Sequence, residues 1–173
     1  SPETDGDAER GACADDAKTP VPDDAAHLRG EWILLSSFRK YPDLSKMTET
    51  LNSAALLLRG RPSQVILPSA PWWFGSHSAL AAFHTVIGEA EREAARLEEY
   101  IALYSRLTDG HGSGADVLFR AELAYQEGDL TGAEIHAYKA SFLAESKQQS
   151  VVQLGAAMIL AQIALQKADW AGW

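Results

Sequence analysis

The sequence predicts an all-α fold, an α-solenoid of stacked antiparallel helix pairs. Three observations lead to this prediction. Apolar residues recur at three- and four-residue steps, which is the period of an amphipathic helix, and strand-like runs are almost absent. A corner made of a small residue, an acidic residue and a helix start recurs at a period of about 40 residues, as expected of stacked helix pairs. The corners are Gly88-Glu89-Ala90, Gly128-Asp129-Leu130 and Ala168-Asp169-Trp170.

A further corner, Pro42-Asp43-Leu44, lies 46 residues before the first of these. An irregular insertion at 60–76 explains the larger interval, because it contains Pro62, Pro68 and Pro71 and follows no hydrophobic period. Each helix pair has a face that it cannot bury alone, so neighbouring pairs must stack on one another. The alternative is an irregular helical bundle whose corners coincide by chance.

The helices follow in order from these breaks. The first begins at about residue 25, and its apolar stripe consists of Leu28, Trp32, Leu35 and Phe38. The second begins after Asp43, which offers an N-cap, and runs to about residue 58. Its expected buried face consists of Leu44, Met47, Leu51 and Ala55. Beyond the insertion, helices are expected at 77–87, 89–107, 114–127, 130–147 and 150–167.

Residues 25–173 are expected to form one helical-repeat domain, preceded by a flexible acidic leader at residues 1–24. The leader holds eight acidic residues against two basic ones, and such a segment buries too little apolar area to offset its ordering entropy. An acidic arm that grips a basic partner is the alternative. Because the chain opens on Ser1 and stops soon after its last corner, we expect an excised segment whose C-terminal end is truncated within a repeat.

Between Val117 and Ala140 the spacing of small residues resembles the tetratricopeptide repeat (TPR). The matching residues are Ala121, Ala124, Gly128, Leu130, Ala133 and Ala140. Most of the large aromatic residues of that repeat are missing, so the stretch resembles a divergent member. The resemblance implies TPR-like helix pairs that stack as a right-handed superhelix.

Longer strings carry a second resemblance. They are GEWILLSSF at 30–38, SAPWWFGS at 69–76 and RLTDGHGSGA at 106–115, followed by Ala121-Glu122, Gly128-Asp129 and Ala133-Glu134. Together they resemble the helical-repeat region of large ATP-binding LuxR-type (MalT-like) transcriptional regulators. The resemblance covers about residues 28–173, and the strings around Trp72 and His111 are its more specific part.

Regulators of this family join an N-terminal nucleotide-binding module, a helical-repeat sensor and a C-terminal helix-turn-helix domain, and the chain resembles the sensor alone. The resemblance therefore implies that ATP is bound only by a missing N-terminal module, and DNA only through a missing C-terminal domain. The chain contains no Gly-x-x-x-x-Gly-Lys-Ser/Thr phosphate loop. No cofactor is expected in this segment.

Composition narrows the functional classes. The net charge of −9 and the pI near 4.9 disfavour direct binding to nucleic acid. Apolar runs are far shorter than the roughly 20 residues that span a bilayer, no secretory signal is visible, and the single Cys13 cannot form an internal disulfide. We therefore expect a cytoplasmic protein without membrane contact. The histidines are scattered and the acidic residues lie on helix surfaces, so neither a metal site nor catalysis is expected.

Three adjacent aromatic residues, Trp72, Trp73 and Phe74, stand between Pro71 and Gly75 in the insertion. If exposed, they would form a stacking platform for a flat ligand or an anchor for a partner. If buried, they would fix the insertion onto the solenoid. We favour burial, because three exposed aromatic rings would form an adhesive patch.

A glycine-rich turn at 110–114 places His111 directly before a predicted helix. Backbone N–H groups in such a turn could face an anion. We favour a turn between helices that needs positive φ, because acidic residues flank it on both sides.

The first helix of each pair is expected to line the concave face of the solenoid. In the clearest pair this helix offers Glu122, Tyr125 and Gln126, and Gln162 lies one repeat further on. A hydrated surface without a ligand is the alternative.

These features predict a non-enzymatic sensor or interaction domain of a LuxR-family regulator, which binds a small-molecule effector or a protein partner. The alternative is a general TPR-type scaffold for protein–protein interaction. Trp170 and Trp173 are expected to begin the first helix of a pair whose partner is absent, or to dock against the final helix. Dimerisation, as a homodimer, or crystal contacts are expected there, because a terminal repeat without a polar cap leaves apolar surface.

Overall fold

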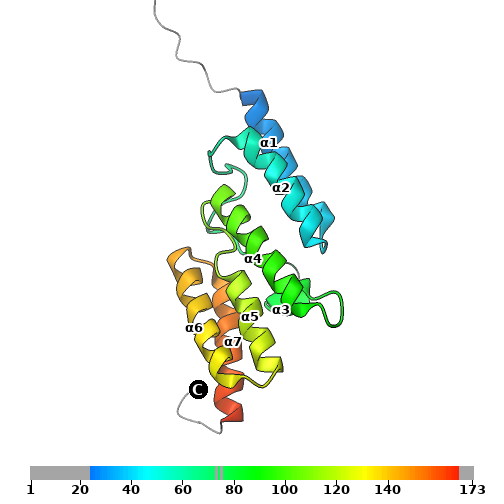
Figure 1. Cartoon of the computed structure of the whole chain (residues 1–173). Helices are drawn as coiled ribbons and strands as arrows, with labels where there is room; N and C mark the ends of the chain where they lie inside the picture. The colour runs from blue at the N-terminus through cyan, green and yellow to red at the C-terminus, as the bar shows by residue number, and fades with distance from the viewer. Residues whose placement is uncertain (1–23, 73, 75, 168–173) are drawn as a thin grey trace, which may run out of the picture.

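The structure, a computed structural model, describes residues 24–72, 74 and 76–167, and these form helices and loops without any strand (Figure 1). The all-α prediction is confirmed. Nearly all of the leader, Trp73 and the last corner with Trp170 and Trp173 lie outside the described residues. The elements are α1 (Asp24–Ser37), the 3-10 turn η1 (Phe38–Lys40), α2 (Leu44–Leu58), α3 (Ala79–Phe83), α4 (Ala90–Leu107), α5 (Ala115–Gln126), α6 (Leu130–Ser146) and α7 (Ser150–Gln166).

The predicted corners begin helices as expected. Asp43 caps α2 by accepting a hydrogen bond from the N–H of Lys46 (3.1 Å), and Asp129 caps α6 in the same way through Gly132 (2.9 Å). Gly88 and Gly128 adopt nearly the same positive φ, 85° and 84°, a conformation that glycine adopts without strain. Glu89, however, precedes α4 without a capping hydrogen bond from its side chain.

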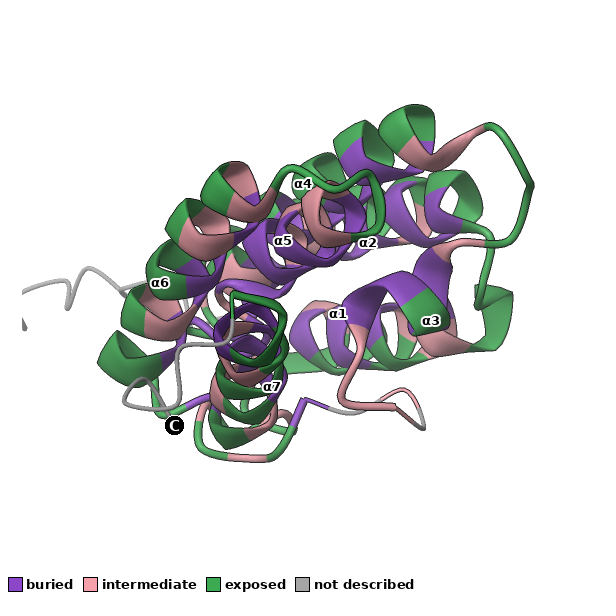
Figure 2. Ribbon diagram, turned by 90° about the horizontal axis from the view of Figure 1, so that it is seen from below, coloured by how far each residue is buried: buried purple, intermediate pink, exposed green. Residues whose placement is uncertain are grey.

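Each helix packs on neighbours that are close in sequence. Helix α1 packs on α2, α2 on α4, and α5 on α3, α4, α6 and α7, while α6 also packs on α7. Figure 1 shows the result as an elongated array, with α1 and α2 at one end and α5–α7 at the other. Buried residues lie on the sides where the helices face one another, and exposed residues cover the outside (Figure 2). No described helix is both long enough and apolar enough to cross a membrane.

Small residues allow helices α5 and α6 to approach closely. Ala133, Ala137 and Ala140 on α6 are all fully buried. At Gly114, which precedes α5 with φ of 89°, an added Cβ would lie 2.7 Å from the carbonyl oxygen of Ala140. The close contact therefore requires glycine at this position.

The apolar stripe of α1 does not face the core. Leu28 and Trp32 are 68% and 67% exposed, Leu35 is also exposed, and only Phe38 packs partly against the core. The buried side instead carries one large apolar residue, Leu34, among the small and polar residues His27, Gly30, Glu31 and Ser37. Gly30 favours this orientation, because it lies against Leu58 of α2. A Cβ added at Gly30 would be 2.9 Å from Cγ of Leu58.

Two other expectations need correction. The helix expected at 77–87 is only the five-residue α3, because residues 84–88 form a loop that Glu93 holds by hydrogen bonds. On α2, Leu44, Met47 and Leu51 are buried as predicted, but Ala55 is only half-buried. Ala54 and Leu58 complete the buried face of this helix instead.

The insertion at 60–76 is irregular, as predicted, and a buried glutamine holds it in place. Gln149, fully buried before α7, accepts a hydrogen bond from the N–H of Gly112 (2.8 Å) through Oε1. Its Nε2 donates to the carbonyl oxygens of Pro68 (2.5 Å) and Lys147 (2.8 Å). One side chain thus joins three loops: the insertion, the glycine-rich turn and the corner between α6 and α7.

We expect Gln149→Ala to lower the free energy of unfolding by about 2–4 kcal/mol, because it leaves the buried N–H of Gly112 without an acceptor. Urea denaturation measures this. The matched control, Gln166→Ala, changes an exposed glutamine near the end of α7 and should cost less than about 0.5 kcal/mol. Equal small effects of the two variants would contradict the role of Gln149.

Candidate functional site

The four residues predicted to line a concave face meet in one cavity. Glu122, Tyr125 and Gln126 project from α5, and Gln162 projects from α7. The cavity has a volume of about 290 Å³. We call it the Glu122 cavity; its lining residues are His77, Ser78, Leu80, Glu122, Tyr125, Gln126, Gly155, Met158, Ile159 and Gln162.

A glycine brings α7 close enough to form this cavity. At Gly155 an added Cβ would lie 2.6 Å from both the carbonyl oxygen of His77 and Cδ2 of Leu118. Any larger residue would push α7 away from α3 and α5, and with it Gln162. The predicted repeat spacing and this close approach together place Gln162 beside the α5 residues.

Glu122 is the charged group of the Glu122 cavity, and it already has partners. Only 6% of the residue is exposed, and Oε2 accepts a hydrogen bond from the N–H of Leu80 (2.6 Å). The carboxylate lies at the start of α3, where helix N–H groups lack intrahelical acceptors. Burial raises the pKa of Glu122 to about 7, and bonds from Leu80, Ser78 and Ala79 partly oppose this rise.

The chemistry of the Glu122 cavity suits recognition by hydrogen bonds. Gln126 and Gln162 are exposed carboxamides, and Tyr125 is a half-buried phenol. Leu80 and Ile159 are buried and supply an apolar floor. Concave sites with an apolar lining and a few converging polar groups are typical of small-ligand binding. Because the lining contains no lysine or arginine, it favours neutral or cationic groups over anions.

Trp72 and His111, predicted as separate candidates, line a second cavity together. It has a volume of about 410 Å³. We call it the Trp72 cavity; its lining residues are Phe38, Val65, Ile66, Leu67, Ala70, Pro71, Trp72, Phe74, Tyr104 and His111. Trp72 is 2% exposed and His111 is 7% exposed. The cavity therefore lies where the insertion meets α4 and the glycine-rich turn.

Trp72 is buried, as the packing interpretation expects. Its ring stacks on Phe83 with centroids 5.9 Å apart and meets Phe74 edge-on at 5.2 Å. The indole also fills the space at Gly112, where an added Cβ would lie 2.8 Å from Cδ1. With φ of 78° at Gly112, the glycine-rich segment is a turn that needs positive φ. Trp73 lies outside the described residues.

His111 is held as a buried imidazole. Its Nδ1 lies 2.8 Å from the hydroxyl of Tyr104. Burial lowers the pKa of His111, although the nearby carbonyl groups of Pro71 and Ala70 oppose this shift. His111 is therefore neutral near pH 7.

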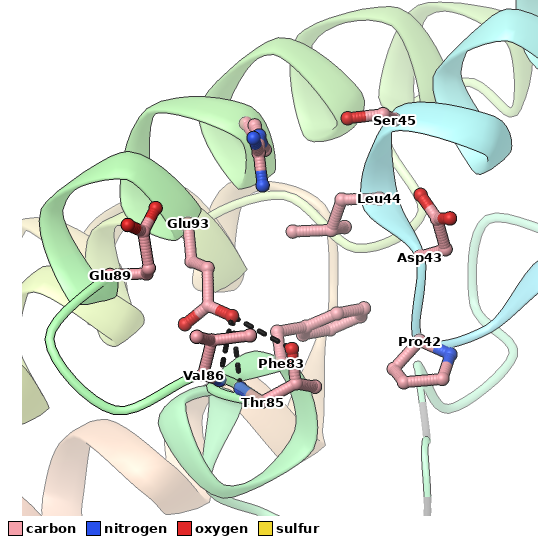
Figure 3. A pocket seen from close by; sticks show the side chains of 10 residues that line it. Pro42, Asp43, Leu44, Ser45, Phe83, Thr85, Val86, Glu89 and Glu93 are labelled. Atoms are coloured by element: carbon pink, nitrogen blue, oxygen red, sulfur yellow. Dashed lines mark hydrogen bonds between the residues drawn. The ribbon is translucent and has the colours of Figure 1, made fainter.

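A third cavity was not predicted from the sequence. It has a volume of about 590 Å³ and lies between the corner at Pro42-Asp43 and the corner at Glu89 (Figure 3). Glu93 of α4 accepts hydrogen bonds here from the N–H groups of Thr85 (3.0 Å) and Val86 (3.2 Å) and from the Thr85 hydroxyl (2.8 Å). Burial would raise the pKa of Glu93, but hydrogen bonds from Thr85 and His84 and the charge of His84 lower it overall. The sequence signal that could have indicated this cavity is the similarity of the two corners, because equivalent corners of successive helix pairs are expected to lie close together.

Within the described ranges, no three histidine, cysteine, aspartate or glutamate side chains are arranged to hold a metal ion. Comparison of the chain with family models, curated proteins and solved structures found no match. The function is therefore inferred from the geometry of the cavities.

We expect Glu122→Gln to raise the free energy of unfolding at pH 8 by about 1–3 kcal/mol, because the amide removes a buried charge. Since the folded-state pKa of about 7 exceeds the usual value of 4.5, the wild-type protein loses stability as pH rises from about 4.5 through 7. At pH 5 the wild-type carboxyl is already protonated, and the difference should vanish.

Urea denaturation at pH 5 and pH 8 measures this effect. The control, Glu127→Gln, changes an exposed carboxylate directly after α5 and should show no such pH dependence. A Glu122→Gln difference that is the same at both pH values would contradict the raised pKa.

Proposed function

We propose that the chain is a non-enzymatic recognition domain built of stacked, TPR-like helix pairs. The observation that carries the proposal is the Glu122 cavity, in which Glu122 and Gln162, which are 40 residues apart, lie on the same wall with Tyr125 and Gln126. A repeat of this length would place equivalent positions of successive pairs side by side. The ligand is a small molecule or a side chain of a protein partner.

The order of packing supports the proposed stacking of pairs. Helix α5 packs on its corner partner α6 and on the helices before and after it in the array, α3 and α7. Helices α2 and α4, which follow the two corners at Asp43 and Glu89, also pack on each other. Helices α3 and α4, the pair joined by the corner at Glu89, pack more weakly on each other than on these neighbours. The contacts between successive pairs support the proposed α-solenoid, and a right-handed superhelix remains part of the proposal.

The hydrogen bonds that the buried carboxylates form favour a binding role over catalysis. Glu31, Glu93 and Glu122 each accept a hydrogen bond from a backbone N–H group of the chain itself. Carboxylates used in this way hold loops and helix ends. We therefore propose no enzymatic activity and no cofactor for this segment.

The wider role that we propose is that of the sensor region of a large LuxR-type transcriptional regulator. The support is the resemblance of the strings at 30–38, 69–76 and 106–115, of which the last two meet in the Trp72 cavity. A ligand that prefers one arrangement of the helix pairs would shift the population of the whole regulator. In this proposal ATP and DNA are bound by other modules, and the sensor works in the cytoplasm.

A second candidate function is a TPR-type scaffold that binds a protein, including a second copy of this chain. It is favoured by the outer side of α6, where Ile135, Tyr138 and Phe142 are 62%, 61% and 72% exposed. These residues recur at helical spacing and form an apolar surface of the kind found at protein interfaces.

Thermal-shift measurements with a panel of sugars, amino acids and nucleosides test the sensor function. A compound that binds the Glu122 cavity should raise Tm by several degrees when its concentration is about 100 times Kd. Gln162→Ala should reduce this shift without changing Tm in the absence of ligand, because the residue is exposed. Gln166→Ala, on the same helix outside the cavity, is the control. If no compound raises Tm while the chain self-associates or captures a protein, the scaffold function replaces the sensor function.

A further inference from the structure

The Trp72 cavity combines an aromatic wall with a hydrogen-bond donor that lacks a partner. Phe38 and Phe74 lie beside Trp72 and Tyr104, with ring centroids of neighbouring pairs 5.2–5.9 Å apart. The indole nitrogen of Trp72, Nε1, is buried and forms no hydrogen bond with any described residue. A buried donor without a partner costs free energy, so a ligand that supplies an acceptor oxygen would offset this cost.

His111, beside this donor, already has polar partners. Its Nδ1 lies 2.8 Å from the hydroxyl of Tyr104, and backbone hydrogen bonds with Pro71 and Ala70 oppose the effect of burial on its pKa. Trp72 therefore supplies the unpartnered donor of the cavity.

We infer that the Trp72 cavity binds an apolar, ring-sized molecule that carries one hydrogen-bond-accepting oxygen, such as a carbonyl oxygen. The ring contacts the aromatic wall, and the oxygen accepts from Trp72 Nε1–H. The volume of about 410 Å³ is ample, because a cavity of roughly 150 Å³ already holds benzene. This site is separate from the Glu122 cavity and goes beyond the proposed function.

The lining excludes the other ligand classes. It contains no lysine, arginine, aspartate or glutamate, so an ionised ligand would lose its hydration without gaining a counter-charge. Solvent does not reach Trp72 Nε1, so the ligand oxygen must displace part of the wall to reach it. Val65 and Leu67, which are 56% and 61% exposed, are the exposed apolar residues of this wall.

A matched pair of probes tests this inference on the full chain. Acetophenone and ethylbenzene have nearly the same shape, but only acetophenone carries an acceptor oxygen. We expect acetophenone to bind about three- to tenfold more tightly, the range of one net hydrogen bond. In titrations followed by proton–nitrogen NMR, acetophenone should move the indole N–H signal of Trp72 downfield, and ethylbenzene should not.

Trp72→Phe keeps an aromatic ring and removes the N–H group, so it should reduce the preference for acetophenone while leaving ethylbenzene binding nearly unchanged. Trp32→Phe, at an exposed tryptophan of α1, is the matched control and should preserve the preference. Equal affinity for the two probes, a preference that survives Trp72→Phe, or no binding of either at millimolar concentration would each overturn the inference. If Trp72→Phe fails to fold, the wild-type indole signal still decides.

Discussion

The structure depends on buried side chains that bind the backbone N–H groups of its irregular connections. Glu31 binds Gln64 in the insertion, Glu93 binds the loop after α3, and Glu122 binds the first turn of α3 itself. Gln149 does the same for the glycine-rich turn. The N–H groups of Leu80 and Gly112 would otherwise be buried without an acceptor, at a cost comparable to a lost hydrogen bond. The walls of all three cavities are segments held in this way.

The helix boundaries could be predicted because their signals are local. Asp43 and Asp129 cap helices through residues three positions further on, and Gly128, with its positive φ, directly follows the C-cap of α5. The buried side of α1 could not be predicted, because it depends on distant contacts. Leu28 and Trp32 follow the helical period, yet Gly30 packs on Leu58 and turns that stripe outward.

The candidate sites were predictable to different degrees for the same reason. The repeat length alone suggests that Glu122 and Gln162 lie close together, and the structure places both in one cavity. The meeting of Trp72 with His111 depends on the path of the insertion, which has no period from which a path could be predicted. The role of Gln149 could not be predicted, because the sequence does not distinguish a buried glutamine that hydrogen-bonds several loops from an exposed one.

The Gln149 side chain joins segments that are far apart in sequence. In a plain array of helix pairs each unit touches only its neighbours. Here the Gln149 side chain bonds to Pro68, which is 81 positions away in sequence. The insertion cannot move away from the start of α7 without breaking this bond, so local opening of one segment is coupled to opening of the other.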